Sequence, residues 1–285
     1  MPMLRGFLSL LRIRQWLKNL MLYFPPFLGG ALFSLGFNRY TLLPFGAFCL
    51  VSSANYICND VFDRHNDRHH PDKRIRAIAS GKISITSALL FAAVLLICSL
   101  LMAWNISGMF LAIMMMYVAI SFAYSVKLKE IVLLDVFCIS AGFLLRLQAG
   151  GVAFNVPISE WLFTSVFLLA LFLSTGKRLS EKQSLGEDAR HHRKALMAYP
   201  KGFLEGVMYM TGSSVLVTYT MYAISRRSLL LLYSVPLCCF GLLRYLFRIR
   251  SGKSGDPTES LIMDLPLLIV GVVWVSLVGW GIYGR

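Results

Sequence analysis

The sequence is poor in charged residues. Asp, Glu, Lys and Arg make up 15% of the 285 residues, whereas a soluble globular domain contains about 25%. The charges that are present form short basic stretches between long apolar segments. These segments are about 20 residues long, the length that a helix needs to cross a bilayer, and they lack the polar–apolar alternation of barrel strands. The composition therefore excludes an ordinary soluble domain and predicts an all-α, polytopic membrane bundle that forms one domain over residues 1–285.

No CxxC pair occurs among the six cysteines, and five of the six lie within apolar runs. Such cysteines behave as small hydrophobic residues, so neither a disulfide framework nor a zinc site is expected. The N-terminus also lacks the small-residue cleavage site of a secretory signal peptide, and arginines interrupt its apolar stretch. Residues 1–16 are predicted to form an amphipathic helix at the membrane interface.

Nine apolar segments are long enough to be membrane spans, and Pro25 and Pro26 should kink or break the first of them. The segments are residues 17–36, 41–60, 86–104, 107–124, 130–150, 160–178, 203–224, 229–247 and 263–283. If the N-terminus lies inside, the inner side holds all 28 lysines and arginines except Arg39, Arg146, Arg226, Arg227 and Arg285. The positive-inside rule thus predicts a cytoplasmic N-terminus in a bacterial inner or plasma membrane. Short basic loops separated by spans do not suit nucleic acid, so this charge is expected to face the lipid bilayer.

The second predicted span ends in a group of acidic and amide side chains: Asn59, Asp60, Asp63 and Asp67. If the helix continues, the three aspartates lie within about 60° of one another on its surface. Carboxylates on one helix face repel each other, and more strongly at a membrane interface. Such a cluster calls for a cation, and its oxygen ligands suit Mg²⁺, which takes its remaining ligands from water and substrate phosphates. The alternative is a solvated helix end without a metal.

A basic stretch with Lys73, Arg74 and Arg76 follows these aspartates at close range. Carboxylates that hold Mg²⁺, next to cations that hold phosphate oxygens, are the arrangement expected for a metal–phosphate complex. Membrane anchoring by the same cations is the alternative. We predict that two polar loops, residues 61–85 and 179–202, lie on the cytoplasmic side and cap the active site.

A second polar cluster, Lys177, Arg178 and Glu181, lies at the end of the sixth predicted span and mirrors the first. Lys177 and Glu181 are four residues apart, so a simple ion pair is the alternative to a role in binding. Asp256 is interpreted as the N-cap of the ninth span, with Pro257 in the first helical turn and Glu259 completing a capping box.

Further polar residues lie near or inside the predicted spans. Anchoring explains the charges of one such group but not its amides, so contact with a lipid phosphate is predicted for Arg14, Gln15, Lys18 and Asn19. Within the fifth span, Asp135 and Arg146 lie on nearly the same helix face, and charges inside a membrane are commonly functional. Arg146 is near enough to the outer end for its side chain to reach the interface, which leaves Asp135 as the stronger candidate.

The pattern Asn59-Asp60-x-x-Asp63-x-x-x-Asp67, followed by a basic loop that ends in Ala79-Ser80-Gly81, resembles a motif of the UbiA superfamily of intramembrane prenyltransferases. Nine spans with an inner N-terminus agree with that fold. The resemblance implies that a diphosphate binds through Mg²⁺ at two motifs, after the second and sixth spans. It implies a metal site at Asn59, Asp60, Asp63 and Asp67, and a catalytic set of Asp60, Asp63, Asp67 and Glu181.

More narrowly, five stretches resemble the decaprenyl-phosphate phosphoribosyltransferase branch: residues 14–19, 59–81, 133–151, 176–181 and 255–259. The resemblance implies Mg²⁺-dependent transfer of a 5-phosphoribosyl group from phosphoribosyl diphosphate to a polyprenyl phosphate, with release of diphosphate. The substrate phosphates would then bind Lys73, Arg74, Arg76, Lys177 and Arg178. The chain departs from the superfamily at Ala77, commonly a proline, and in its second motif, which is rich in aspartate in users of prenyl diphosphates. The cation at Lys177 fits a donor of a different kind.

Two other functions agree with part of the sequence. A UbiA-type aromatic prenyltransferase would use the same first motif with a prenyl diphosphate, but the residues Lys177 and Glu181 argue against it. A membrane transporter or flippase would explain charges within spans, but the carboxylates gather at the interface and not at mid-bilayer, where transport sites lie. A homo-oligomer is compatible with the sequence in each case.

Overall fold

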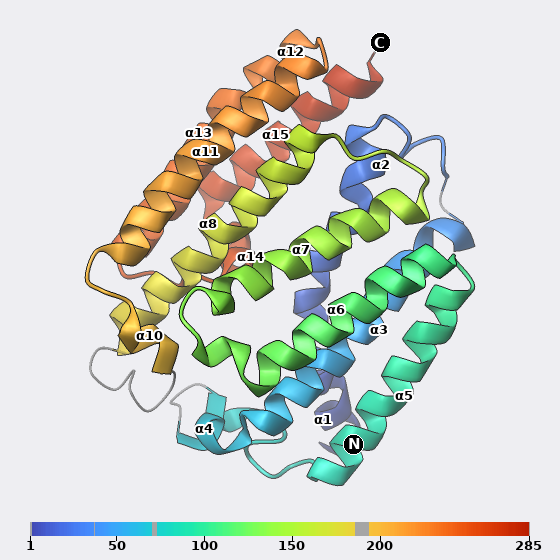
Figure 1. Ribbon diagram of the computed structural model, residues 1–285, viewed down its shortest axis with the longest axis vertical. Coiled ribbons are helices and arrows are strands. Elements are labelled where there is room, and N and C mark those ends of the chain that lie inside the picture. The colour runs from blue at the N-terminus through green and yellow to red at the C-terminus, as the bar shows by residue number, and fades with distance from the viewer. Residues whose placement is uncertain (1, 37, 70–72, 186–193, 285) are drawn as a thin grey trace.

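The computed structural model describes the whole chain apart from residues 1, 37, 70–72, 186–193 and 285 (Figure 1). The described residues form helices and turns without a strand, as the all-α prediction requires. In chain order the helices are α1 (Pro2–Leu10), η1 (Ile13–Tyr23), α2 (Phe24–Leu28), α3 (Arg39–Phe62), α4 (Arg64–His69), η2 (Lys73–Ile75), α5 (Ile85–Trp104), α6 (Gly108–Val126), η3 (Leu128–Glu130), α7 (Leu134–Ala153), α8 (Glu160–Leu185), α10 (Lys194–Ala198), α11 (Phe203–Ser225), α12 (Leu229–Tyr233), α13 (Val235–Arg250), α14 (Pro257–Met263) and α15 (Leu265–Tyr283). The η elements are 3₁₀ helices.

Seven helices among the described residues are long and apolar enough to cross a membrane, so the chain is an integral membrane protein. They are α3, α5, α6, α7, α8, the pair α12–α13, and α15. The 23-residue helix α11 matches a predicted span in length, but its Thr, Ser and Tyr residues make it less apolar. The first predicted span, 17–36, is not one helix, because η1 ends at Tyr23 and Pro25 and Pro26 lie in the first turn of α2. The predicted break near these prolines is present. The second piece, α2, ends at Leu28, eight residues before the end of the predicted span.

The structure divides residues 1–16 into two elements instead of the single amphipathic helix that was predicted. Helix α1 ends at Leu10, and Arg12 has a left-handed backbone (φ 50°) just before η1 begins. For a residue with a side chain this conformation costs about 1–2 kcal/mol. Strained residues of this kind concentrate at functional sites, and the Arg12 side chain does reach the end of α3, where it meets Asp60.

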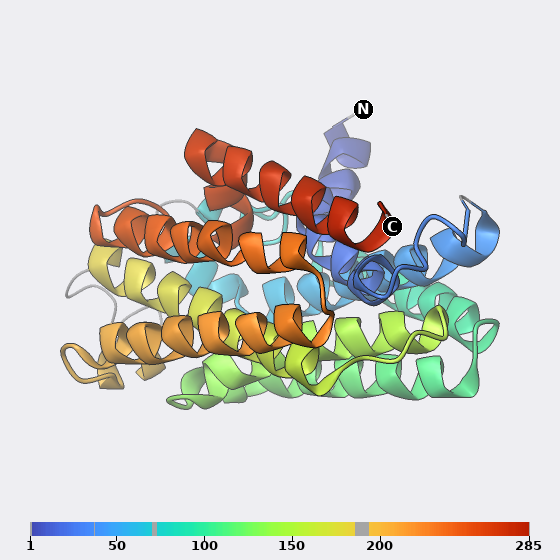
Figure 2. The same ribbon diagram turned by 90° about the horizontal axis from the view of Figure 1, so that it is seen from above.

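Helix α7 lies at the centre of the bundle, between α6 and α8, and η1 packs across it (Figures 1 and 2). At Gly150 of α7 an added Cβ would lie 2.1 Å from the carbonyl oxygen of Leu22 in η1, so the two backbones can approach this closely only at a glycine. On the two sides of this centre, α3 pairs with α5, and α8 pairs with α11. The two helices that carry the polar motifs, α3 and α8, are therefore held by a shared neighbour.

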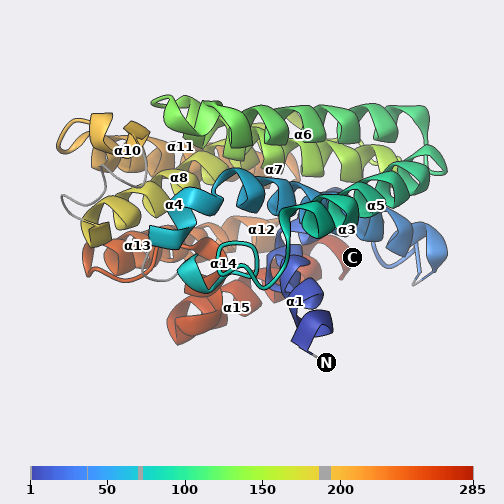
Figure 3. The same cartoon turned by 90° about the horizontal axis from the view of Figure 1, so that it is seen from below.

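The predicted polar loops differ from expectation in one respect. Residues 61–85 contain α4 and η2, as a loop with short helices, whereas residues 179–185 are not loop because α8 continues to Leu185. The remainder of the second loop lies partly outside the described residues. The connector η3 joins the two regions, because it packs against α10 and its Lys129 pairs with Asp63. We call the end of the bundle that carries Asp60, Lys177 and Asp256 the polar end; Figure 3 views the molecule from the side where α1, α4 and α14 are seen.

Candidate active site

The end of α3 positions the first polar motif. Asp63 caps α3, and its backbone N–H donates to the carbonyl oxygen of Asn59 at 2.9 Å. The N–H of Asp67 in α4 donates in turn to the carbonyl oxygen of Asp63 at 2.8 Å. The chain therefore keeps a helical course from Asn59 to Asp67 almost without interruption, as the sequence pattern predicted.

Asp60 and Asp67 share one arginine. Nη1 of Arg76 donates to Oδ1 of Asp60 at 3.0 Å and to Oδ2 of Asp67 at 2.7 Å. Arg12 donates from Nη2 to the same oxygen of Asp60 at 2.5 Å. Both carboxylates are buried, and these cations compensate for the water that burial removes from them. The motif thus draws its counter-charges from the N-terminal segment as well as from the predicted basic loop.

Asp63 has a separate partner, Lys129 of η3, whose Nζ donates to Oδ1. Asn59 donates from Nδ2 to the other carboxylate oxygen of Asp63 at 2.9 Å. Lys129 was not among the predicted site residues. It lies 66 positions away in sequence, in a short connector between α6 and α7, and no local pattern distinguishes it from an anchoring lysine.

The other predicted cations of the basic loop lie in η2. Arg74 is exposed, whereas Lys73 is partly buried and interacts electrostatically with Asp67. Of the two arginines in this loop that were predicted to bind substrate phosphate, the structure therefore brings Arg76 to the carboxylates and leaves Arg74 at the surface.

The oxygen ligands at the end of α3 fit a hard cation such as Mg²⁺, but they do not form a complete cage. Oδ1 of Asn59 is buried and accepts no hydrogen bond from the described residues, which is unusual for a buried oxygen and leaves it free as a ligand. In the part of the chain that the structure describes, no group of three or more His, Cys, Asp or Glu side chains is arranged to hold a metal ion, since the aspartates face Arg12, Arg76 and Lys129. An ion here would take further oxygen ligands from water or phosphate, as Mg²⁺ commonly does.

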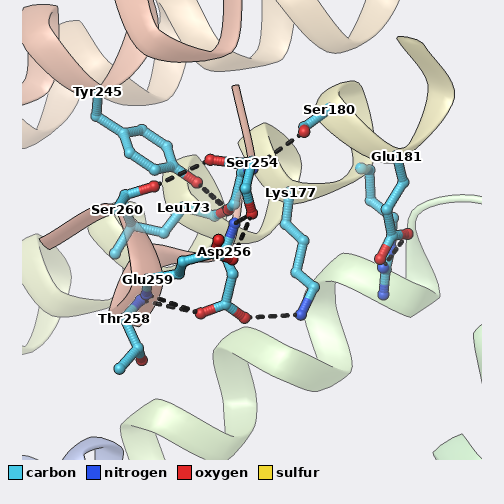
Figure 4. A network of polar contacts seen from close by, with 12 residues as sticks. Leu173, Lys177, Ser180, Glu181, Tyr245, Ser254, Asp256, Thr258, Glu259 and Ser260 are labelled. Carbon is cyan, nitrogen blue, oxygen red and sulfur yellow. Dashed lines mark hydrogen bonds and ion pairs between the residues drawn. The ribbon is translucent and has the colours of Figure 1, made fainter. Parts of the chain in front are cut away.

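Lys177 points from α8 to the start of α14 and not toward Glu181 (Figure 4). Its Nζ donates to Oδ2 of Asp256 at 3.0 Å, so the simple pair of Lys177 with Glu181 is not the one that forms. Oδ1 of Asp256 accepts two backbone N–H groups from the first turn of α14, which confirms the predicted N-cap. Glu259 accepts a hydrogen bond from Ser254 at 2.7 Å; the capping box was a wrong prediction. Asp256 is thus a cap and a site residue at once.

The loop before α14 is pressed against α8 at Gly255. A Cβ atom added to Gly255 would lie 2.7 Å from Cβ of Ser180 and 2.8 Å from the carbonyl oxygen of Gly176. The Gly255 N–H donates to Oγ of Ser180 at 3.0 Å, and the hydroxyl of Tyr245 donates to the Gly255 carbonyl oxygen at 2.6 Å. These contacts hold Asp256 opposite Lys177.

Arg178 is enclosed between helices. Its Nε donates to Oδ2 of Asp135 (2.7 Å), Nη1 to Oε2 of Glu181 (2.8 Å) and Nη2 to the hydroxyl of Tyr124 (3.0 Å). Tyr199 donates to the second oxygen of Asp135 at 2.7 Å. Each guanidinium nitrogen of Arg178 thus has a protein partner, so the side chain supports Glu181 and α7; the predicted contact with a substrate phosphate stays a prediction.

The predicted lipid-phosphate residues are spread over η1. Arg14 is exposed and Gln15 is partly buried. Lys18 interacts electrostatically with Arg12 of the first polar cluster and with Lys177 and Asp256 of the second. Lys18 is therefore within electrostatic range of both clusters.

Asn19 and Arg146 are structural partners. Asn19 is fully buried, donates to Oγ of Ser52 at 3.2 Å and accepts from Nε of Arg146 at 2.8 Å. Arg146 also donates to the hydroxyl of Tyr117 at 2.8 Å and lies over the ring of the same residue. The expected approach of Arg146 to the interface was wrong. Asn19 ties η1 to α3 and α7, and its predicted contact with a lipid phosphate stays a prediction.

The carboxyl groups outside the spans differ in their titration. Burial raises the pKa of Asp67 above its ordinary value, although Arg76 favours the carboxylate. Burial acts in the same direction on Asp256, but Lys177 and Lys18 outweigh it, and the pKa of Asp256 is lowered. The folded protein therefore favours the ionised form of Asp256. The nearby cations do not fully offset the cost of burying the charge of Asp67, so an additional cation would stabilise its ionised form.

Comparison with known proteins assigns the chain to a family. The sequence profile of the UbiA prenyltransferase family matches residues 23–268. The chain is 32% identical over 294 residues to decaprenyl-phosphate phosphoribosyltransferase of Mycolicibacterium smegmatis, which covers 98% of this chain and 92% of that protein. It is 31% identical over 288 residues to the protein of the same name from Mycobacterium tuberculosis, with 96% and 93% covered.

The fold gives the same result. A UbiA homolog from Archaeoglobus fulgidus, solved with GPP and Mg²⁺, superimposes with a TM-score of 0.75 at 21% identity, over 98% of this chain and 100% of that one. The family profile covers both α3 and α8, whose ends carry the two polar clusters. The resemblance inferred from the residues Asn59 to Asp67 is confirmed, and the chain belongs to the UbiA prenyltransferase family of membrane transferases.

Proposed function

We propose that the protein transfers a 5-phosphoribosyl group from phosphoribosyl diphosphate to a polyprenyl phosphate of the decaprenyl type, in a Mg²⁺-dependent reaction that releases diphosphate. The observation that carries the proposal is Lys177, which pairs with Asp256 at 3.0 Å. It stands in the second motif, which is rich in aspartate in users of prenyl diphosphates. A cation at this position suits a donor that has a 5-phosphate in addition to its diphosphate. The shared name of two relatives that match nearly the whole chain supports the same donor and acceptor.

The first polar cluster is the proposed diphosphate site. Its oxygen ligands, Asn59, Asp60, Asp63 and Asp67, would hold Mg²⁺, which supplies positive charge next to the leaving diphosphate. Arg12, Arg76 and Lys129 neutralise these carboxylates in the structure. When a phosphate group lies beside the carboxylates, the same three cations can donate to its oxygens, because guanidinium and ammonium groups bind phosphate strongly. The cluster can therefore accept a substrate without a large change in net charge.

The acceptor phosphate requires no general base, because it is already an anion at neutral pH. It requires cations near both polar clusters, and Lys18 is within electrostatic range of Arg12 in the first and Lys177 in the second. Carbon 1 of the ribose would pass through a state with oxocarbenium character, which carboxylates such as Glu181 can stabilise electrostatically. Arg178 holds that carboxylate at 2.8 Å, so its proposed role is to position Glu181.

The membrane arrangement completes the proposal. We infer that η1–α2 and α11 join the seven apolar spans in a set of nine, and that the polar end faces the cytoplasm. The excess of lysines and arginines in the segments of the polar end supports this orientation. A soluble donor would then enter from the cytoplasm beside residues 61–85 and the end of α8, and a lipid acceptor would enter from the bilayer.

An aromatic prenyltransferase is the second candidate function. The observation in its favour is the fold shared with a homolog that was solved with GPP and Mg²⁺. At 21% identity this likeness concerns the fold, and the Lys177–Asp256 pair and the relatives that match at 31–32% identity favour the phosphoribosyl donor.

The end of the bundle opposite the polar end argues against a transporter. Arg226 of α11 donates to the carbonyl oxygen of Leu28 at the end of α2. The hydroxyl of Tyr283 in α15 donates to the carbonyl oxygens of Pro26 and Phe27 at 3.1 and 2.9 Å. These bonds tie α2 to α11 and α15, and a transport path through the centre would have to break them.

The test is transfer of radiolabel from phosphoribosyl diphosphate to polyprenyl phosphate by the purified protein, with Mg²⁺ and with a chelator. We expect label to enter the organic phase in the reaction with Mg²⁺ and not in the reaction with the chelator. A parallel reaction contains geranyl diphosphate and 4-hydroxybenzoate. If only this second reaction gives product, the phosphoribosyl proposal is wrong and the aromatic prenyltransferase is supported. Asp60→Asn serves as the folded but inactive control in both reactions.

A further inference from the structure

Two arginines share one carboxylate where α13 ends and α15 begins. Arg244 donates to Asp264 through Nε (3.0 Å to Oδ1) and Nη2 (3.0 Å to Oδ2). Arg248, one turn further along α13, donates from Nη1 to the same Oδ2 at 2.9 Å. The group carries two positive charges and one negative charge, so it has an excess of one positive charge. None of these three residues has been assigned a role in the proposed reaction.

The carboxylate has no capacity left for more donors. Oδ1 of Asp264 also accepts the backbone N–H of Leu267, as the N-cap of α15. Each oxygen thus accepts two hydrogen bonds, which is the number that its lone pairs allow. The Arg248 side chain is 6% exposed, and its Nε is buried without an acceptor in the described part of the chain. A buried N–H of a charged group without a partner is costly, which indicates that an acceptor from outside the chain belongs here.

The surroundings identify the source of that acceptor. The Arg244 side chain remains 29% exposed, and the residues beside it on the helix surfaces are apolar and exposed: Leu243, Phe247, Met263, Leu265 and Leu268. Helices α13 and α15 pack together at the edge of the bundle (Figure 2). Exposed apolar residues on membrane-spanning helices face the acyl chains of the bilayer. A free phosphate would not use these apolar residues, but a phospholipid would.

We propose that Arg244 and Arg248 bind the phosphate of an anionic phospholipid headgroup, with the acyl chains lying on the exposed faces of α13 and α15. A headgroup with net negative charge cancels the excess positive charge of the two arginines, which a zwitterionic headgroup does not. Its phosphate oxygens supply acceptors that Asp264 lacks. The site lies near the ends of helices at the polar end, because α14 joins Asp264 to Asp256, and there headgroups of the adjacent leaflet are within reach.

The test measures retained lipid in the full-length protein. Purified protein is equilibrated with mixed micelles that contain phosphatidylglycerol and phosphatidylcholine at equal concentration, and bound lipid is measured by native mass spectrometry. We expect selective retention of phosphatidylglycerol, and a roughly tenfold loss of its affinity in Arg248→Gln, since a charge-assisted hydrogen bond is removed. The matched control is Arg250→Gln on the same helix, because Arg250 is more exposed and contacts Glu205 at 3.4 Å. Equal retention of phosphatidylglycerol in the wild type and both variants would overturn the proposal.

A second variant guards against a failure of Arg248→Gln to fold. Asp264→Asn keeps the cap of α15 but removes the competing carboxylate, so phosphatidylglycerol should be retained as well as or better than in the wild type. Weaker retention in Asp264→Asn would contradict the proposal. Inorganic phosphate alone is the final probe: if it protects the lipid-free protein against thermal unfolding in an Arg248-dependent manner while phosphatidylglycerol is not retained, the site binds free phosphate and the lipid assignment is wrong.

Discussion

Nε of Arg178 in α8 lies 2.7 Å from Oδ2 of Asp135 in α7, and the two side chains are 2% and 1% exposed. Breaking a buried ion pair from one side typically costs about 3–5 kcal/mol, because the remaining charge is left uncompensated. Arg178 would keep Glu181 as a partner in Asp135→Asn, whereas Asp135 would keep no cation among the described residues in Arg178→Gln. We therefore expect both variants to lower the midpoint of thermal unfolding in detergent, and Arg178→Gln to lower it more. The reverse order would show that the Asp135–Arg178 pair does not carry this stability.

This pair also shows what the sequence could and could not predict. The membrane helices were predictable because span length and hydropathy are local properties. The placement of Asp60, Asp63 and Asp67 at one helix end followed from helical periodicity. The orientation of the Arg178 side chain was not predictable, because its partner Asp135 lies in another helix, more than 40 positions earlier in the chain. The same holds for Lys129 and Asp63, 66 positions apart.

Neighbours in sequence were also misleading when tertiary packing offered a better partner. The spacing of Lys177 and Glu181 on one helix offered an ion pair as an alternative, but Asp256 is held opposite Lys177 by the close approach of Gly255 to α8. Arg146 was expected to reach the interface, but Asn19 and Tyr117 provide polar partners inside the bundle. In each case a residue far away in sequence supplies the contact, and no periodic pattern encodes it.

Neutralising a carboxylate of the first polar cluster should abolish the transfer reaction without unfolding the protein. Asp60→Asn and Asp63→Asn each remove one negative charge next to the proposed diphosphate site, and we expect a loss of at least about hundredfold in the transfer rate, as for other electrostatic contacts of a transition state. The rate is measured with labelled phosphoribosyl diphosphate, and elution on size exclusion verifies the fold. Arg250→Gln, at the same end of the bundle, is the control that should keep the wild-type rate. Near-normal turnover in either aspartate variant would contradict the assignment.

Lys129 should influence how much Mg²⁺ the enzyme needs. In the structure its ammonium group pairs with Asp63, so it competes with a metal ion for that carboxylate. Lys129→Met removes the competitor, and the Mg²⁺ concentration for half-maximal transfer should fall severalfold, even if the maximal rate also falls because a phosphate-binding cation is lost. Lys129→Arg, which retains the charge, is the matched control. A half-maximal concentration that is unchanged or higher in Lys129→Met would show that Lys129 and Mg²⁺ do not compete.

Neutral substitutions of Asp67 and Asp256 should change stability in opposite directions. Burial raises the pKa of Asp67, and an acid whose pKa is raised by folding destabilises the folded state at every pH above that pKa. The pKa of Asp256 is lowered, because Lys177 and Lys18 outweigh burial, and its ionised form therefore stabilises the folded state. At pH 7 and without Mg²⁺, Asp67→Asn should unfold at a higher temperature than the wild type, and Asp256→Asn at a lower one.

The pH dependence of these differences provides the control. The advantage of Asp67→Asn should appear as the pH rises from about 3.9, the ordinary pKa of an aspartate, through the raised pKa, and then stay constant. The deficit of Asp256→Asn should be complete above about pH 3.9 and disappear as the pH falls through the lowered pKa. Thermal unfolding of the three proteins in a pH series measures both effects. Shifts of the same sign at pH 7 would contradict the opposite roles of the two carboxylates.

Gly255 should be as sensitive to substitution as the charged residues, although it has no side chain. In Gly255→Ala the new Cβ would lie 2.7 Å from Cβ of Ser180 and 2.8 Å from a carbonyl oxygen of α8. These neighbours are a helix backbone and a short side chain, which cannot yield, so the loop before α14 must move away and carry Asp256 with it. We expect a loss of transfer rate comparable to that of Asp256→Asn, with the membrane helices intact by circular dichroism. Gly241→Ala in α13 is the control, because nothing lies within 4 Å of its new Cβ. If Gly255→Ala is as active as Gly241→Ala, the contact of Lys177 with Asp256 is not required for the reaction.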